Sequence, residues 1–156
     1  MINSFQKTLL SLIIALIPIY SFSIEPPNNL VVQILENGNE NDEKTKIMDL
    51  ITVNYTGWLF NSSIKTIKPC DAKGNIFDSN VDEKFNHKKP FQFILGRGLV
   101  IKGWDMGLQN MKINEKRCLV IPAKLAYGNR RIGDIIKPNS TLIFEVKLLE
   151  ILKTQR

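Results

Sequence analysis

The chain has 156 residues, a formal net charge of +6 and only one histidine. This length fits one ordinary domain, and the sequence contains neither an internal repeat nor a long low-complexity segment. The basic side chains are scattered and form no arginine cluster interleaved with aromatic residues, so the composition argues against a nucleic-acid partner. A lysine-rich solvated surface explains the positive charge instead.

The first 23 residues have the pattern of a secretory signal peptide. Lys7 supplies a positive charge, an apolar run follows over residues 9–20, and the small residues after it predict cleavage before Ile24. The apolar run is shorter than the roughly 20 residues of a membrane-spanning helix, and an uncleaved membrane anchor is the alternative. We therefore expect residues 24–156 to form a single exported domain, periplasmic or secreted, without stable membrane insertion after cleavage.

Beyond this segment, short strand patterns alternate with polar loops. Apolar residues recur as they do in strands over residues 30–35, 50–55, 91–95, 117–122 and 141–149, with a shorter apolar stretch at 76–79. The second strand is expected to continue through residues 58–60 beyond a bulge at Gly57. Polar or irregular segments separate the strands and cover residues 36–49, 61–75, 80–89 and 124–138.

One short helix is predicted within residues 96–111. Four apolar side chains recur at spacings of three and four, on one helical face: Ile101, Trp104, Leu108 and Met111. The first turn of a helix leaves backbone N–H groups unpaired, so an apolar floor meets free donors near Val100 and Ile101. From this stretch alone, Trp104 is better interpreted as a core anchor. The elements predict an α+β domain of five or six strands and one short helix, an antiparallel sheet with the helix packed on one face.

Five short motifs follow one another along this domain. They are Val53–Gly57 (VNYTG), Phe77–Ser79 (FDS), Val100–Asp105 (VIKGWD), Pro122–Gly128 (PAKLAYG) and Pro138–Val146 (PNSTLIFEV). In this order they resemble the FKBP family of peptidyl-prolyl cis-trans isomerases, and with the signal pattern an exported, bacterial-like member of it. The resemblance extends from Leu30 to Leu152. It implies the FKBP-like α+β fold, a twisted antiparallel β-sheet of five or six strands wrapped around one short α-helix. It also implies an enzyme that accelerates rotation of Xaa-Pro peptide bonds during the folding of exported proteins.

The resemblance also implies a role for each residue at a matching position. The proline ring of the substrate would lie on Trp104, while Tyr127 and the backbone N–H of Ile101 would each donate a hydrogen bond to a substrate carbonyl. Asp78 would lie at the edge of the pocket, close to the twisting imide bond. The remaining residues expected to bind the substrate are Tyr55, Phe77, Phe91, Val100, Ile132, Ile135, Ile136 and Phe144.

The chemistry of this reaction suits such a pocket. Resonance keeps the peptide bond planar, and cis-trans rotation about it has a barrier of roughly 18–20 kcal/mol. Twisting the bond makes its carbonyl less dipolar, so an apolar pocket favours the twisted state over the planar one. We expect the protein to be a monomer and to need neither a cofactor nor a metal. The expected partners are proline-containing polypeptides and macrolide inhibitors of the tacrolimus and rapamycin type.

The sequence departs from the family pattern at several positions. Leu99 stands where the family often has Glu or Gln, and Lys137 replaces the first proline of a usual Ile-Pro-Pro. The basic residue that commonly pairs with the pocket aspartate has no clear counterpart. Its candidates are Lys84, Lys88 and Lys89. The single histidine, His87, is interpreted as a solvated loop residue because it lies in a polar segment.

Cys70 and Cys118 are expected to form a disulfide, as cysteine pairs do in exported domains, with two unpaired thiols as the alternative.

Two other functions are alternatives to isomerisation. A non-catalytic module that binds proline-containing peptides could use the same pocket, but the complete set of pocket residues argues against it. A general chaperone would carry a dimerising helical arm or an inserted flap domain, and neither is visible in the sequence.

Overall fold

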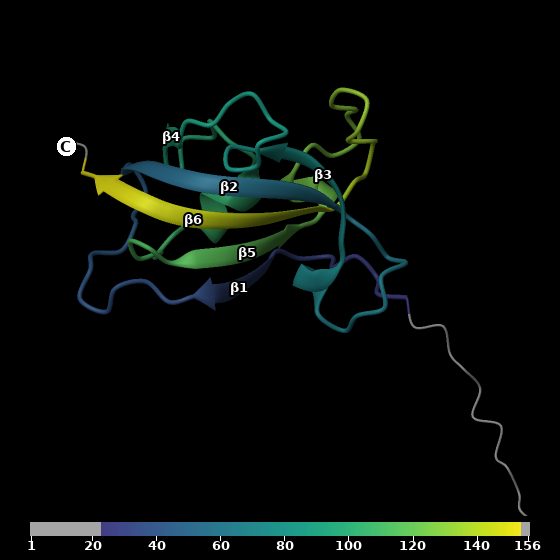
Figure 1. The fold of residues 1–156 in the computed structure, drawn as a ribbon, viewed down its shortest axis with the longest axis horizontal. Helices are drawn as coiled ribbons and strands as arrows, with labels where there is room; N and C mark the ends of the chain where they lie inside the picture. Colours follow the sequence, from purple (N-terminus) through teal and green to yellow (C-terminus); the bar gives the residue numbers. More distant parts are fainter. Residues whose placement is uncertain (1–22, 154–156) are drawn as a thin grey trace, which may run out of the picture.

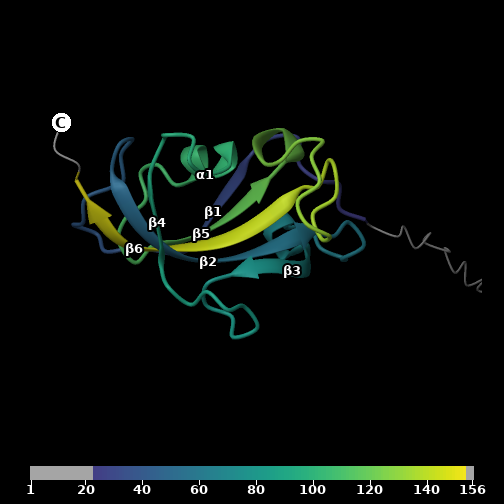
Figure 2. The ribbon, with the colours of Figure 1, turned by 90° about the horizontal axis from the view of Figure 1, so that it is seen from above.

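The computed structural model describes residues 23–153, which form one antiparallel sheet and one short α-helix (Figure 1). The strands are β1 (Val31–Glu36), β2 (Leu50–Phe60), β3 (Lys73–Ser79), β4 (Phe91–Ile94), β5 (Lys116–Ile121) and β6 (Leu142–Leu152). The helix α1 spans Lys102–Gly107, and there are two short 3-10 turns, η1 (Pro69–Asp71) and η2 (Ala123–Leu125). Figure 2 shows the sheet curving around α1, which confirms the predicted α+β fold.

Except for Ser23, the predicted signal peptide lies outside the described residues, so cleavage before Ile24 stays a prediction. Across residues 23–153, no helix combines the length and the apolar character that crossing a membrane requires.

The longest strand pairing joins β2 to β6, from Leu50 opposite Leu152 to Leu59 opposite Leu142. The sheet has the order β1-β5-β6-β2-β3, and β4 pairs with a separate part of β2. The predicted bulge appears as a shift of register after Gly57 on the β3 side, whereas the β6 pairing passes this point without interruption. β2 therefore runs as one long strand between β6 and β3, and Tyr55 near its middle contacts Trp104 of α1.

The helix is shorter than the spacing of apolar residues predicts. Ile101 and Leu108 are its cap residues, and Met111 lies beyond its end. The side chains nevertheless turn toward the sheet, because Trp104, Leu108 and Met111 are buried in the main core. A Cβ atom at Gly103 would lie 2.4 Å from Cγ2 of Ile121 in β5. Glycine at this position is therefore what lets α1 lie so close to the sheet.

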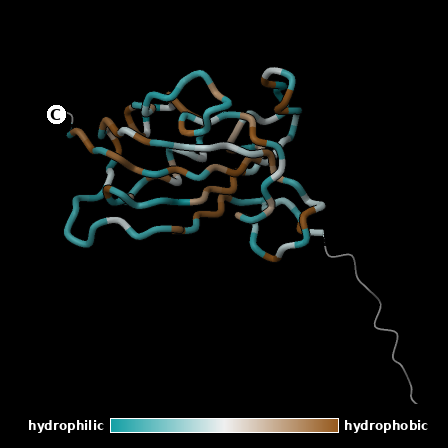
Figure 3. The backbone as a smooth tube through the Cα atoms, viewed as in Figure 1, coloured by the Kyte–Doolittle hydropathy of each residue, from teal (hydrophilic) through white to brown (hydrophobic). Residues whose placement is uncertain are grey.

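The loop between β1 and β2 is mostly hydrophilic, as predicted for residues 36–49 (Figure 3). Its last part is nonetheless fixed to the segment after α1. Thr45 is fully buried, and its hydroxyl donates to the Leu108 carbonyl at 2.6 Å and accepts the Met111 N–H at 2.9 Å. The loop thus supports the end of the helix that carries the pocket floor.

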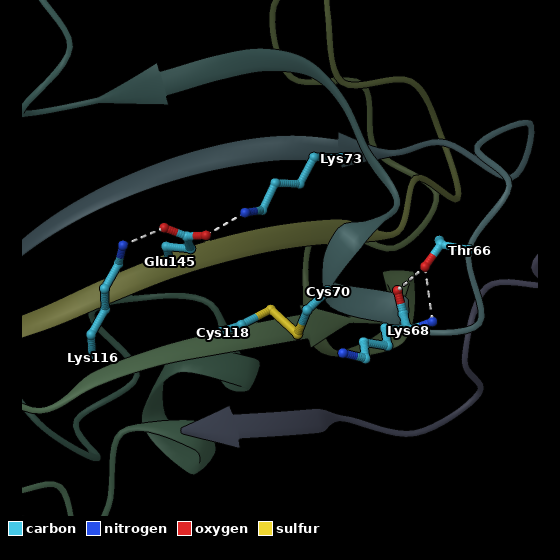
Figure 4. The surroundings of a disulfide bond; sticks show 7 residues. All are labelled: Thr66, Lys68, Cys70, Lys73, Lys116, Cys118 and Glu145. Atoms are coloured by element: carbon cyan, nitrogen blue, oxygen red, sulfur yellow. Dashed lines mark hydrogen bonds and ion pairs between the residues drawn. A yellow bond between two sulfur atoms is a disulfide. The ribbon is translucent and has the colours of Figure 1, made fainter. Parts of the chain in front are cut away.

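The other face of the sheet carries a second, smaller apolar cluster. Its members are Ile24, Cys70, Ala72, Cys118, Val120 and Ile143. A disulfide joins Cys70 in η1 to Cys118 in β5, with their Cα atoms 6.1 Å apart (Figure 4). This bond ties the long polar segment before β3 to β5.

Beside the disulfide, Glu145 accepts hydrogen bonds from Lys73 and Lys116 (Figure 4). Burial alone would raise the pKa of the Glu145 carboxyl, but the two ammonium groups outweigh it and lower that pKa. The carboxylate therefore stays charged and links β6 to β5 beside it and to β3 on the far side of β2.

Candidate active site

A cavity of about 210 Å³ opens between α1, β2, β3 and the loop that follows η2. The residues that line it are Tyr55, Phe77, Asp78, Phe91, Leu99, Val100, Ile101, Trp104, Tyr127 and Phe144. This volume is below the roughly 300–1,000 Å³ of a typical small-molecule pocket. The cavity therefore suits one small ring of a larger ligand.

The floor of the cavity is Trp104, which is only 4% exposed. The rings of Tyr55 and Phe144 meet it edge-to-face, with centroids 5.3 and 5.2 Å away. Both arrangements match the preferred geometry of aromatic pairs and hold the indole in one orientation. The indole Nε1 is buried and has no hydrogen-bond partner among residues 23–153, so aromatic packing alone orients this side chain.

One glycine makes room for the aromatic walls. Gly57 in β2 lies directly opposite Phe144 in β6. A Cβ atom at this position would lie 2.7 Å from Cζ of Phe77 and 2.8 Å from Cε1 of Phe144. Any side chain here would displace two rings of the cavity wall, which explains why the Val53–Gly57 motif ends in glycine.

Asp78 lies at the polar edge of the cavity, where its carboxylate contacts two side chains. Its Oδ2 accepts a hydrogen bond from the Tyr55 hydroxyl at 2.7 Å, and its Oδ1 lies 2.8 Å from Nε2 of His87. His87 is a loop residue whose side chain is 56% exposed, as predicted, but its contact with Asp78 was not predicted. Of the three predicted lysine partners, Lys88 lies instead 3.8 Å from Glu83.

The contact of His87 with Asp78 was missed because hydrogen bonds from the Ser79 and Asn80 side chains set the path of its loop. The Ser79 hydroxyl accepts the N–H groups of Val81 and Asp82, at 3.2 and 3.0 Å. The Asn80 amide donates to the carbonyl of Lys89 at 3.2 Å, which ties the far end of the loop to its start. No periodic pattern in residues 80–89 signals these contacts.

Both tyrosines of the cavity keep their protons. Burial, followed by the hydrogen bond to Asp78 and its charge, raises the pKa of the Tyr55 hydroxyl well above its usual value. Burial also raises the pKa of Tyr127, with a further contribution from Asp78 that Arg130 partly offsets. The Tyr127 hydroxyl is thus available as a donor at the cavity rim.

A backbone donor borders the same cavity. Ile101 is the N-cap residue of α1, and its carbonyl accepts the Trp104 N–H at 2.9 Å. The N–H of Ile101 donates to no group of residues 23–153. The Asp105 carboxylate shapes the loop before it by accepting the N–H groups of Gly96 and Gly98 at 2.8 and 2.9 Å. The sequence prediction missed Asp105, although an acid in the first helical turn after two glycines is a usable signal.

Residues 41–149 match the sequence model of the FKBP-type peptidyl-prolyl cis-trans isomerases. The chain belongs to this family. FK506-binding protein 2 of Dictyostelium discoideum is 40% identical to it over 143 residues, which cover 92% of this chain and 95% of that protein. An FK506-binding protein of Neisseria meningitidis is 46% identical over 101 residues, or 65% of this chain and 78% of that protein.

FK506-binding protein 2B of Rhizopus delemar is 42% identical over 129 residues, which cover 81% of this chain but only 54% of that protein. The family match and these relatives support peptidyl-prolyl cis-trans isomerase activity. Because the relatives include eukaryotic and bacterial proteins, the exported, bacterial-like subclass stays a prediction.

Three predicted site residues of this FKBP-type domain lie beside the cavity and not in it. Ile132, Ile135 and Ile136 line a neighbouring hollow that shares Phe77, Asp78 and Tyr127 with the cavity. Ile136 is 5% exposed and belongs to the main core, and backbone hydrogen bonds at 3.0 and 3.3 Å join it to Ile132. All other predicted pocket residues line the cavity itself, together with Leu99, which is 65% exposed.

Proposed function

We propose that the protein accelerates cis-trans rotation of Xaa-Pro bonds during the folding of exported polypeptides. The observation that carries this proposal is an apolar cavity of ring size, about 210 Å³, with hydrogen-bond donors at its rim. In this account the prolyl ring lies on Trp104. The Tyr127 hydroxyl and the Ile101 N–H bind carbonyls on either side of it, so the flanking chain is held while the imide bond turns.

The cavity lowers the rotation barrier by binding the twisted bond better than the planar bond. Resonance in the planar imide places negative charge on the carbonyl oxygen, and water stabilises that charge. The aromatic walls replace water with a surface that offers this dipole much less stabilisation. The Asp78 carboxylate lies at the edge of the cavity, close to the proposed position of the twisting imide bond. No covalent bond to the protein forms in this scheme.

Export is part of the same proposal. The signal-peptide pattern over residues 1–23 supports it, as does the buried disulfide between Cys70 and Cys118, because disulfides persist in oxidising compartments. We propose a periplasmic or secreted protein, with an uncleaved membrane anchor as the alternative location.

The cavity is also the proposed site for macrolides of the tacrolimus and rapamycin type. Several relatives carry the name FK506-binding protein. Such macrolides present a pipecolinyl ring, a six-membered mimic of proline, next to a twisted dicarbonyl. The ring would occupy the floor at Trp104, so macrolide and peptide should compete.

A coupled isomerisation assay with Xaa-Pro peptides tests the proposal. The purified protein should raise the isomerisation rate in proportion to its concentration, and a macrolide should abolish the increase. Peptide binding measured in parallel separates the alternatives. Binding without any acceleration would replace the isomerase by a non-catalytic peptide-binding module.

A further inference from the structure

We propose that His87 is a positioning residue that holds the Asp78 carboxylate in place and makes isomerisation depend on pH, with activity falling as the imidazole loses its proton. The inference rests on the proposed isomerase function and extends it to the regulation of the same site.

The geometry around Asp78 fixes its carboxylate from both sides. Tyr55 donates to Oδ2 at 2.7 Å, and Nε2 of His87 lies 2.8 Å from Oδ1. Each oxygen thus has one partner, and the two partners come from β2 and from the loop before β4. Since a lone hydrogen bond leaves a carboxylate free to rotate, the second contact is what sets its plane beside the cavity.

The loop that carries His87 is held at both ends. Asn80 donates to the Val53 carbonyl at 3.1 Å and to the Lys89 carbonyl at 3.2 Å. Within the loop, the ring of Phe85 lies 6.2 Å from the imidazole in an edge-on arrangement. These contacts direct the imidazole toward the cavity edge even though more than half of it is exposed.

Three titratable groups besides His87 bear on the charge of this cluster. The groups that face the pair are the Tyr55 and Tyr127 hydroxyls, and Arg130 lies close enough to Tyr127 to affect its charge. Burial, as the largest cause, raises the pKa of both tyrosines, so they stay neutral, and arginine stays charged. Histidine is the side chain that changes charge between about pH 5 and 8.

The sign of the effect follows from the charges. For isolated side chains, a carboxylate and an imidazolium coexist between about pH 4 and 6.5. Above this range the neutral imidazole can still donate through Nε2, but the attraction between opposite charges is lost. Because the side chains of His87 and Asp78 are 56% and 37% exposed, solvent screens this attraction, and we expect kcat/KM to fall only about two- to fivefold.

The test measures kcat/KM of an Xaa-Pro peptide from pH 5 to 8.5 by a protease-free assay. The wild-type protein should lose activity as the pH rises, whereas His87→Arg should keep the low-pH value throughout. His87→Gln should be less active than the wild type at low pH and show no dependence. Lys88→Gln is the matched control. It also removes a positive charge from this loop, but the Lys88 ammonium lies beside Glu83, so the variant should follow the wild-type profile. A wild-type profile in His87→Gln would overturn the proposal.

A second readout does not depend on catalysis. His87 is the only histidine of the chain, so its imidazole resonance can be followed by NMR without ambiguity. Its titration midpoint should coincide with that of kcat/KM, and Asp78→Asn should move it to lower pH. An unchanged midpoint in Asp78→Asn would show that the pair does not form in solution. If the wild-type protein were inactive at every pH, the isomerase proposal would fail, while the NMR titration would still decide the pairing.

Discussion

Replacing Trp104 by phenylalanine and by alanine separates its role in the core from its role as the cavity floor. The side chain is 4% exposed and packs against Tyr55 and Phe144. Truncating a buried tryptophan to alanine costs about 3–5 kcal/mol of stability. Phenylalanine keeps an aromatic ring, and the buried Nε1 has no hydrogen bond to lose, so Trp104→Phe should cost only about 1–2 kcal/mol.

The two substitutions should differ in catalysis as well. Trp104→Ala removes the surface on which the prolyl ring lies, and loss of about 1.5 kcal/mol of apolar contact predicts a tenfold or larger drop in kcat/KM. Trp104→Phe should lose less than tenfold. Urea unfolding followed by circular dichroism gives the stability, and the isomerisation assay on the same samples gives the rate, measured only where each variant is folded.

Fluorescence provides the control. The chain has two tryptophans, and Trp58 packs against the apolar cluster on the other face of the sheet. A macrolide should therefore change the emission of Trp58→Phe but leave that of Trp104→Phe unaltered. If folded Trp104→Ala kept the wild-type kcat/KM, or if Trp104→Phe retained the full fluorescence response, Trp104 would not be the floor of the site.

Tyr127→Phe removes one donor at the rim and should weaken macrolide binding by about 0.5–1.5 kcal/mol in a fluorescence titration, whereas unchanged affinity would exclude this hydrogen bond. The disulfide spans 48 positions of the chain. Its reduction should therefore cost on the order of 4 kcal/mol in urea unfolding, and equal stability with and without reductant would contradict that. Because the pKa of Glu145 is lowered, its stabilisation is present above the unfolded carboxyl pKa and is lost as the pH falls through the folded one. Glu145→Gln should thus lower stability near neutral pH and flatten the acid loss, and an unaltered acid profile would argue against it. The protein should sediment as a monomer and keep its activity in EDTA, and activity that EDTA removes and a metal restores would refute this.

The strands could be predicted because their signal is local. Alternating apolar residues such as Phe91 and Phe93, or Leu142 and Phe144, mark one face of a strand whatever lies opposite. The length of α1 could not be predicted in this way. Apolar spacing continues to Met111, but the chain leaves the helix after Gly107 and Thr45 takes over the hydrogen bonds of the next residues.

The cavity walls were accessible through the family resemblance, because motifs such as FDS and VIKGWD carry the wall residues themselves. The partner of Asp78 could not be predicted in this way, because His87 lies nine positions away in a polar loop. Hydrogen bonds of the Ser79 and Asn80 side chains fold that loop back, and such side-chain bonds leave no periodic trace in the sequence. Ile136 was predicted to bind the substrate but lies in the core. The sequence alone cannot separate these two roles, because an apolar residue can belong to the core as readily as to a pocket.

Isomerase activity can be measured directly as the exchange rate between the cis and trans forms of an Xaa-Pro peptide, by NMR at equilibrium. Small amounts of the protein should raise this rate without altering the cis:trans ratio of the free peptide, and a tacrolimus-type macrolide should return it to the uncatalysed value. An exchange rate that stays uncatalysed while the peptide demonstrably occupies the cavity would show that the protein binds proline-containing peptides without isomerising them.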